Sequence, residues 1–415
     1  MIEILKFGGA SIKNTDSIKS VVKILKTYDN ENIVIVFSAI ANVTNLLEEL
    51  VELYTEKSSK VSSKINEIKK LHFDILKDLF NKNHQVYNTV NNLFIEIDWA
   101  LEEEPNLEFS YDYDQIVSVG ELLSSNIMSA YLKECGFSNI FLDIRDVLKT
   151  DNSHQNANID WLLTEKCAND NISSFPSVTQ GFIGCTSENF TTTLGREGSD
   201  FSAAILASVL NASKVVIWKD VDGVLNADPR YFKNPIKIDH LSFQEAIELA
   251  FYGASVIHPK TLQPLKRNNI PLVVRSFIDH QDKGTLISEK ENPNSDNSFY
   301  ILKKNQSLLS ISVNDLDFIV ENHLSAVFLI LDKYNAKVSL VQNSAVSCSF
   351  AIEIDDLLFE GLIQELSKFF SVRYNRGLEL LTIRHYDEID VQKNLLGKEI
   401  LLSQKNRTTL QILYK

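Results

Sequence analysis

Through residues 1–285, short apolar runs alternate with segments whose apolar residues recur every three or four positions. Short continuous runs predict strands, and the longer periodic segments predict helices. The run at 33–37 is apolar throughout, as expected for a strand covered on both faces of a parallel sheet. The predicted strands are 2–7, 33–37, 115–119, 139–142, 177–183 and 214–218.

Helical periodicity covers 16–28 and then 46–80, where it predicts two or more helices, with a coiled coil as the alternative. Further helices are predicted to begin near Glu121, Asp200 and Gln244. Strands and helices therefore alternate, which predicts an α/β sandwich with a mainly parallel sheet. In such a fold, ligands bind in a crevice beyond the carboxyl ends of the strands.

The pattern of apolar and polar residues changes after a polar stretch at 289–298. This stretch has no apolar period and predicts a linker. Beyond it, helices are predicted at 324–334 and 357–370. The predicted strands are 308–313, 337–342, 347–354, 378–384, 399–402 and 409–414. This order describes one small βαββ unit followed by part of another.

Charge and cysteine content limit the classes of function. The chain has 41 Lys and Arg against 55 Asp and Glu, a net charge of −14, which argues against general binding to nucleic acid or to anionic membranes. Its four cysteines show no metal-ligand spacing and no disulfide framework. With no signal peptide and no apolar stretch long enough to span a membrane, we expect a cytoplasmic protein.

The segment 193–200, Thr-Leu-Gly-Arg-Glu-Gly-Ser-Asp, combines the features of an anion site with an acid. Its two glycines let backbone N–H groups approach an anion, Arg196 adds a cation, and Ser199 and Asp200 stand where a helix would begin. Because a simple anion pocket has little use for Asp200, a metal, an ammonium group or a positioned lysine is expected beside it. An ordinary Gly-rich turn is the alternative.

Two more segments follow predicted strands. Lys6 precedes Gly8 and Gly9 at the end of the first strand, where glycines expose backbone donors to a phosphate and the lysine neutralises charge; a tight turn is the alternative. The segment 218–230 packs three acids and two cations into one loop, which suits a nucleotide and its metal, or else a solvated loop.

Together these segments resemble aspartate kinases of the amino acid kinase family in order and spacing. The matching pieces are 6–11, 38–46, Gly120-Glu121, 179–183, 194–200, 220–230, Gly253-Ala254 and His258-Pro259. The resemblance implies a three-layer α/β/α catalytic domain at 1–288 and a linker at 289–299. It also implies ACT-like regulatory domains at 300–370 and 371–415, the second short and completed by the strand near 301–312.

The resemblance implies transfer of the γ-phosphoryl group of ATP, with Mg²⁺ bound through the ATP, to the β-carboxylate of L-aspartate. Lys6 and Asp200 would be catalytic, with Asp200 orienting Lys6, while Glu121 takes the substrate ammonium and Arg196 a carboxylate. The implied substrate-binding residues are Ser38, Thr44, Glu121, Arg196, Glu197, Gly198 and Ser199. The implied ATP-binding residues are Lys6, Gly8, Gly9, Lys219, Asp220, Leu225, Arg230, Ser255 and Val256. His258 is expected to be structural.

Several residues depart from the pattern of the resembling family. Thr is common where Lys219 stands, Tyr where Leu225 stands, Lys where Ser255 stands, Arg where Leu122 stands, and Gly where Glu197 stands. Lys219 or Lys260 is expected to compensate for the lysine missing at 255. Lys219 is also the expected partner of Glu197.

The tail predicts an amino-acid effector and a homodimer or higher homo-oligomer, or simply dimerisation. Lysine-binding members of the resembling family carry an acid where Ser339 stands, so lysine inhibition is not expected here. No homoserine dehydrogenase module is expected in 415 residues. The alternative functions are another carboxylate kinase of the same family and a catalytically weak amino-acid sensor on a kinase scaffold.

Overall fold

The computed structural model describes residues 1–415 apart from 29–31, 107, 255–256, 291–296, 314–317 and 388–396. Its larger sheet has eight strands in the order β10-β12-β11-β7-β1-β2-β4-β3, and every neighbouring pair is parallel except β11 with β12. The mainly parallel α/β architecture predicted from the sequence is confirmed. The strands are β1 Glu3–Phe7, β2 Ile33–Phe37, β3 Ile140–Phe141, β4 Ser177–Gln180, β7 Lys214–Lys219, β10 His240–Ser242, β11 Leu272–Ser276 and β12 Thr285–Ser288.

The centre of the sheet brings three strand ends together. Phe7, the last residue of β1, pairs with Phe37 of β2 and Trp218 of β7, and its ring stacks on both. All three rings are buried, because the central strands are covered on both faces. The polar residues that follow these strands are therefore held at one edge of the sheet.

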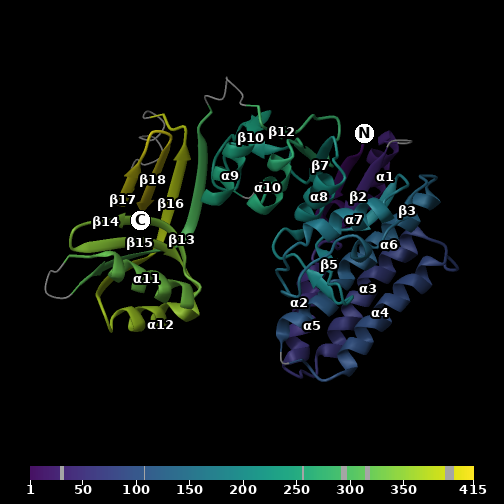
Figure 1. The fold of residues 1–415 in the computed structure, drawn as a ribbon, viewed down its shortest axis with the longest axis horizontal. Coiled ribbons are helices and arrows are strands. Elements are labelled where there is room, and N and C mark those ends of the chain that lie inside the picture. Colours follow the sequence, from purple (N-terminus) through teal and green to yellow (C-terminus); the bar gives the residue numbers. More distant parts are fainter. Residues whose placement is uncertain (29–31, 107, 255–256, 291–296, 314–317, 388–396) are drawn as a thin grey trace. The chain divides into compact units, whose positions relative to one another are not determined.

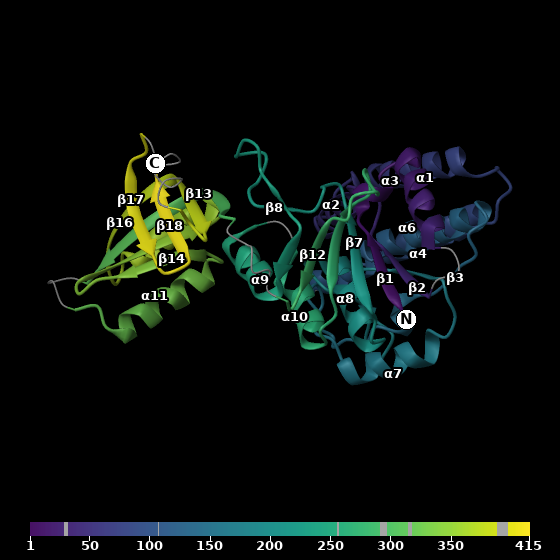
Figure 2. The ribbon, with the colours of Figure 1, turned by 90° about the horizontal axis from the view of Figure 1, so that it is seen from above.

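Helices cover both faces of this sheet, and Figure 2 shows α1, α3, α4 and α6 on one side with α7, α8 and α10 on the other. The helices are α1 Thr15–Leu25, α2 Val43–Thr55, α3 Val61–Leu79, α4 Val86–Glu102, α5 Phe109–Val117, α6 Val119–Glu134, α7 Trp161–Asn171, α8 Gly198–Val209, α9 Phe243–Tyr252 and α10 Pro259–Arg267. Short strands β5 Ile183–Cys185 and β6 Thr191–Thr193 pair with each other, and β8 Val224–Leu225 lies beside β9 Lys237–Ile238.

The strand predicted at 115–119 is wrong, because these residues end α5 and begin α6. Ile116, Val117 and Val119 are all buried, and the chain passes from one helix to the next at Ser118. A short apolar run has the same appearance in a buried strand and at a buried helix junction. Since α6 is buried along nearly all its length, its sequence carries little helical period.

The C-terminal part folds into a six-stranded antiparallel sheet in the order β14-β15-β13-β16-β18-β17. Figure 1 shows α11 and α12 side by side against this sheet, and their apolar faces share a core with β13 and β15. The elements are β13 Phe299–Ser312, α11 Glu321–Lys333, β14 Lys337–Asn343, β15 Ser347–Glu353, α12 Asp356–Leu366, β16 Ser371–Arg384, β17 Ile400–Lys405 and β18 Thr409–Tyr414.

Contacts divide the chain into two compact units that are interleaved in sequence. The first comprises 1–224, 237–247 and 256–292; the second comprises 225–236, 248–255 and 293–415. Residues 291–296 of the predicted linker lie outside the described residues. Among the helices described, none is long and apolar enough to cross a membrane.

Candidate active site

A cavity of about 830 Å³ opens in the first unit, where β1, β2 and β7 end. It is lined by the loop after β1, the segment between β2 and α2, the N-terminal turns of α6 and α8, and the end of β7. The sheet topology thus gathers segments far apart in the sequence around one space. The predicted site residues that line it are Lys6, Gly8, Gly9, Ser38, Thr44, Glu121, Arg196, Glu197, Gly198, Ser199, Asp200, Lys219 and Asp220.

One wall of the cavity carries a cluster of paired charges. Lys6 Nζ lies 2.5 Å from Asp200 Oδ1, and Lys219 Nζ lies 3.4 Å from Asp200 Oδ2. Lys6 and Asp200 are both buried. Burial alone would raise the pKa of Asp200, but the two ammonium groups outweigh it and hold this pKa below its usual range. Asp200 therefore stays ionised and fixes Lys6 at the end of β1.

The glycine pair after β1 lies against the segment that follows β2. A Cβ atom on Gly9 would stand 2.7 Å from the carbonyl oxygen of Ala39, closer than real Cβ contacts come. Ser11 closes the turn by donating its hydroxyl to the carbonyl of Gly8, at 2.7 Å. Glycine is needed at position 9 because the two backbone segments approach so closely.

The first turn of α6 adds a buried carboxylate to the same cavity, and only one of its two oxygens is hydrogen-bonded. Glu121, in the first turn of α6, is 3% exposed, and its Oε1 accepts a hydrogen bond from the Ala39 N–H at 3.2 Å. Its Oε2 is buried without a hydrogen-bond partner among the described residues. Burial raises the pKa of Glu121 to about 8, against opposing effects of the Ala39 N–H and the charge of Lys6.

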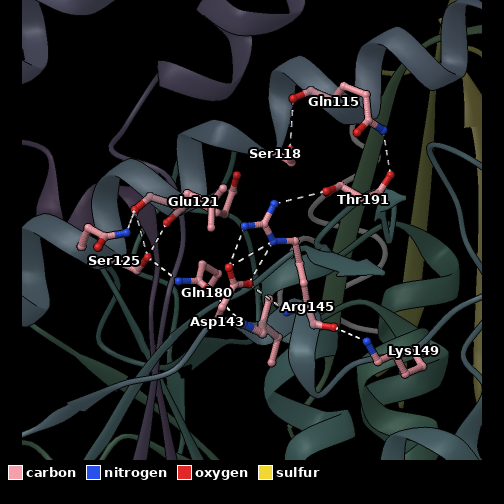
Figure 3. Close-up of polar contacts among 12 residues, drawn as sticks. Gln115, Ser118, Glu121, Ser125, Asp143, Arg145, Lys149, Gln180 and Thr191 are labelled. Atoms are coloured by element: carbon pink, nitrogen blue, oxygen red, sulfur yellow. Dashed lines mark hydrogen bonds and ion pairs between the residues drawn. The ribbon is translucent and has the colours of Figure 1, made fainter. Parts of the chain in front are cut away.

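The backbone of Glu121 is anchored from behind. Ser125 Oγ donates to the carbonyl of Glu121 at 2.7 Å, and Gln180 Nε2 donates to Ser125 Oγ at 2.8 Å (Figure 3). Gln180 Oε1 in turn accepts from the Ile144 N–H at 2.8 Å. This chain of bonds ties α6 to the end of β4, so the first turn of α6 is held firmly.

The loop before α8 is anchored by the residue that departs from the family pattern. Glu197 adopts φ 54°, a left-handed conformation that glycine takes without strain. Its Oε2 accepts a hydrogen bond from the His258 N–H at 3.0 Å, so the recorded contact differs from the expected pairing with Lys219, which lies against Asp200. His258 itself caps α10, and Lys260 Nζ contacts Asn156.

Other predicted residues stand elsewhere. Leu225 and Arg230 do not line this cavity, and Arg230 is held by Asp228 in a bidentate pair, with its Nη2 2.6 Å from Asp228 Oδ2. Ser255 and Val256 fall outside the described residues. The part of the chain that the structure describes contains no group of three or more His, Cys, Asp or Glu side chains that could hold a metal ion.

Several lining residues had no counterpart in the sequence predictions. Tyr113 Oη donates to Glu48 Oε1 at 2.6 Å, and both side chains line the cavity. Glu48 follows Thr44 by four residues on α2, a spacing that could have identified it. Gln155 carries no such signal, because it is placed by its N–H bond to Asp114, on a distant helix.

Comparison with known proteins identifies the family to which the chain belongs. The model of the amino acid kinase family matches residues 1–276, and the chain therefore belongs to that family. The lysine-sensitive aspartokinase 3 of Escherichia coli is 34% identical over 399 residues, which cover 92% of this chain and 86% of that protein. Over nearly its whole length the chain is thus homologous to aspartokinases, and the resemblance drawn from its motifs is confirmed.

Solved structures agree with this placement. E. coli aspartokinase III in complex with lysine and aspartate superimposes with a TM-score of 0.84 at 31% identity, covering 99% of this chain and 95% of that one. The same enzyme in complex with aspartate and ADP gives 0.81 at 30%, covering 100% and 96%. A bifunctional aspartokinase/homoserine dehydrogenase of Arabidopsis thaliana is 32% identical over 70% of this chain, which spans 32% of that protein's length.

Proposed function

We propose that this protein transfers the γ-phosphoryl group of ATP to the β-carboxylate of L-aspartate, giving 4-phospho-L-aspartate. The observation that carries the proposal is that one cavity holds both a cluster of paired charges and a buried carboxylate with an unpartnered oxygen. Lys6 and Lys219 gather around Asp200 beside Gly8 and Gly9, and Glu121 offers a buried, unpartnered oxygen in the same cavity. Homology to aspartokinases supports the same reaction.

Lys6 is proposed to neutralise the phosphoryl group as it is transferred. The attacking β-carboxylate is already ionised at neutral pH, so the reaction needs no strong general base and depends on positioning and charge neutralisation. Asp200 keeps the Lys6 ammonium fixed, which removes the cost of reorganising it during the reaction. Gly8 and Gly9 leave the backbone N–H groups of this loop open to phosphate oxygens.

Aspartate recognition is assigned to Glu121 and Arg196. The unpartnered Oε2 of Glu121 is a site for the substrate ammonium, and binding that cation would also lower the pKa of Glu121. Arg196 lines the cavity with an exposed side chain, suited to a substrate carboxylate. Glutamate is longer by one methylene, so its γ-carboxylate would extend past the position that the β-carboxylate of aspartate takes relative to Lys6.

The nucleotide is proposed to lie along the end of β7, beside Lys219 and Asp220. The structure of E. coli aspartokinase III has been solved with aspartate and ADP, and this supports nucleotide binding by the present protein. Because the described residues include no metal-holding cluster, Mg²⁺ would be bound mainly through the triphosphate. When bound, it would supply charge neutralisation between the phosphates.

The test is aspartate-dependent ADP release with Mg²⁺-ATP, with hydroxylamine added to trap the acyl phosphate. We expect a hydroxamate with L-aspartate, at least about tenfold less with L-glutamate, and at least about 100-fold less from Lys6→Met. Absence of hydroxamate at high protein concentration, from a chain whose circular dichroism shows it folded, would contradict the proposal. Preference for glutamate would instead support another carboxylate kinase of this family.

We further propose that the C-terminal unit binds an amino-acid effector, as E. coli aspartokinase III binds lysine. In this chain Lys303 Nζ lies 3.4 Å from Ser339 Oγ, and burial lowers the pKa of Lys303. A second ammonium beside Lys303 would be repelled, so inhibition by lysine should be weak. Inhibition assays with lysine and threonine on the wild type and on Ser339→Asp check this; strong lysine inhibition of the wild type contradicts it.

A further inference from the structure

A second cavity of about 290 Å³ lies among α2, α4, α5 and α6, and the proposed reaction makes no use of it. Its lining includes four carboxylates, Glu96, Glu103, Glu104 and Asp112. It also includes three aromatic rings, Tyr54, Trp99 and Tyr111. The volume is at the small end of the range for organic ligands.

The cavity keeps an excess of negative charge. Arg145 is the single basic residue in its lining, and its guanidinium is already committed to Asp143, with Nη2 2.6 Å from Oδ2. It also donates to Thr191 Oγ1 at 3.4 Å (Figure 3). The ion pair of Lys57 with Glu104 lies in solvent, since the two side chains are 66% and 84% exposed, and it contributes little.

Asp112 is the residue that points to a ligand. It is 9% exposed, and its Oδ2 accepts a hydrogen bond from the Asn106 N–H at 2.7 Å. Its Oδ1 has no hydrogen-bond partner among the residues that the structure describes, so it can accept a hydrogen bond from a ligand in the cavity. Burial raises the pKa of Asp112, and burial together with the charge of Asp112 raises that of Tyr54.

We propose that this cavity binds an organic cation, a primary ammonium on an alkyl chain, with the ammonium on Asp112 and the chain against the rings of Tyr54 and Trp99. Carboxylates and aromatic faces together form the environment that recognises alkylammonium ions. A bare metal ion fits less well, because the described residues include no set of three acidic, His or Cys side chains placed to hold one. The rings would also be left without a partner.

The second cavity shares its walls with the active site. Ser118, Val119 and Leu122 line it, whereas Glu121, in the same turn of α6, lines the first cavity. Asp112 and Tyr113 divide in the same way on α5. A ligand held in the second cavity therefore contacts the turn that presents Glu121, and we expect it to change the KM for aspartate. This last consequence rests on the proposed function.

The binding test uses the full-length chain and isothermal titration with cadaverine, compared with 1-pentanol, which lacks the ammonium. We expect saturable binding of cadaverine alone. Asp112→Asn should weaken it about tenfold or more, and Trp99→Ala, at a side chain 64% exposed, by several-fold. Glu102→Gln is the matched control, since Glu102 is exposed on α4 and does not line the cavity; it should bind like the wild type.

No binding of cadaverine at millimolar concentration, or binding unchanged in both Asp112→Asn and Trp99→Ala, overturns the proposal. L-Lysine titrated into the same proteins distinguishes the source of the ammonium. Lysine binding weakened by both substitutions identifies an amino acid, whereas cadaverine binding alone identifies a diamine. Titration needs no phosphoryl transfer, so loss of cadaverine binding contradicts this proposal only, and loss of hydroxamate contradicts the proposed reaction only.

Discussion

The two walls of the active-site cavity each carry a carboxylate that is 3% exposed, and their pKa values shift in opposite directions. Asp200 stands between Lys6 and Lys219 and stays ionised. Glu121 has one backbone donor and an unpartnered oxygen, and its pKa rises to about 8. The charges around Asp200 are paired within the protein, whereas Glu121 is proposed to find its partner in the ammonium group of the substrate.

The largest expected effect comes from removing the fixed charge. Lys6→Met should lower kcat by about 100- to 1,000-fold with little change in the KM for aspartate, because Lys6 is proposed to act on the transferring phosphoryl group. Steady-state ADP release measures it. Lys219→Met is the comparison, and should lose less, since its Nζ lies farther from Asp200 than that of Lys6. Equal losses in the two variants would mean that Lys6 has no special role.

Substituting Glu121 should affect the binding of aspartate instead of the chemical step. Glu121→Gln keeps the shape and the acceptor for the Ala39 N–H but cannot pair with an ammonium, so the KM for aspartate should rise about 10- to 100-fold. The KM for ATP should stay near the wild-type value. Glu52→Gln, an exposed acid on α2, is the control. A change in the KM for ATP as large as that for aspartate contradicts the assignment.

The pH dependence of kcat/KM for aspartate tests the role of Glu121 more finely. Free Glu121 must lose its proton to pair with the ammonium, so kcat/KM for aspartate should rise with pH and level off near pH 8, by up to tenfold per unit below it. The rise should vanish in Glu121→Gln. A pH-rate profile for both proteins checks this, and an identical rising limb in the variant would assign the ionisation to another group.

Stability should respond in the opposite direction. The pKa of Glu121 in the folded chain, about 8, exceeds its ordinary value of 4.5, so the folded state holds the proton more tightly. Its contribution is present below pH 4.5 and is lost as the pH rises towards 8. Between pH 6 and 9, the Tm of the wild type should therefore fall more than that of Glu121→Gln by a few degrees. Parallel Tm curves contradict this.

The smallest effect is expected at the loop between the walls. Glu197→Gly relieves a left-handed residue, worth about 1 kcal/mol, but loses the bond to the His258 N–H, worth about the same, so the free energy of unfolding should change little. Glu197→Ala loses the bond and keeps the strain, and should be destabilised by about 1 kcal/mol. Urea unfolding measures both, and equal stabilities would show that φ at this position costs nothing.

The strand-end residues were predictable from the sequence because parallel strands bring their carboxyl ends to one edge. Lys6 lies near the end of the predicted strand 2–7, Ser38 and Lys219 follow the strands 33–37 and 214–218, and the motif 193–200 adds the helix start near Asp200. The parallel arrangement of the strands was enough to predict that these residues lie close together. The roles assigned to them remain predictions until the variants are measured.

The residues that escaped prediction depend on contacts between helices. Tyr113 and Gln155 reach the cavity through α5, which meets α6 at the apolar run interpreted as a strand. Glu197 likewise could not be paired from the sequence alone, because its partner is the backbone of His258, 61 residues away. A backbone donor carries no residue type, so no motif records it.

The interleaving of the two units also bears on how the protein can be cut. Asn226, which belongs to the second unit, accepts a hydrogen bond from the Tyr300 N–H at 2.8 Å and donates its side-chain amide to the carbonyl of Ser298 at 3.0 Å. A fragment ending at residue 288 would keep Asn226 and lose both partners. Expressed alone, such a kinase fragment should be more sensitive to proteases at 225–236 than the intact chain is, so its behaviour should not be taken for that of the whole enzyme.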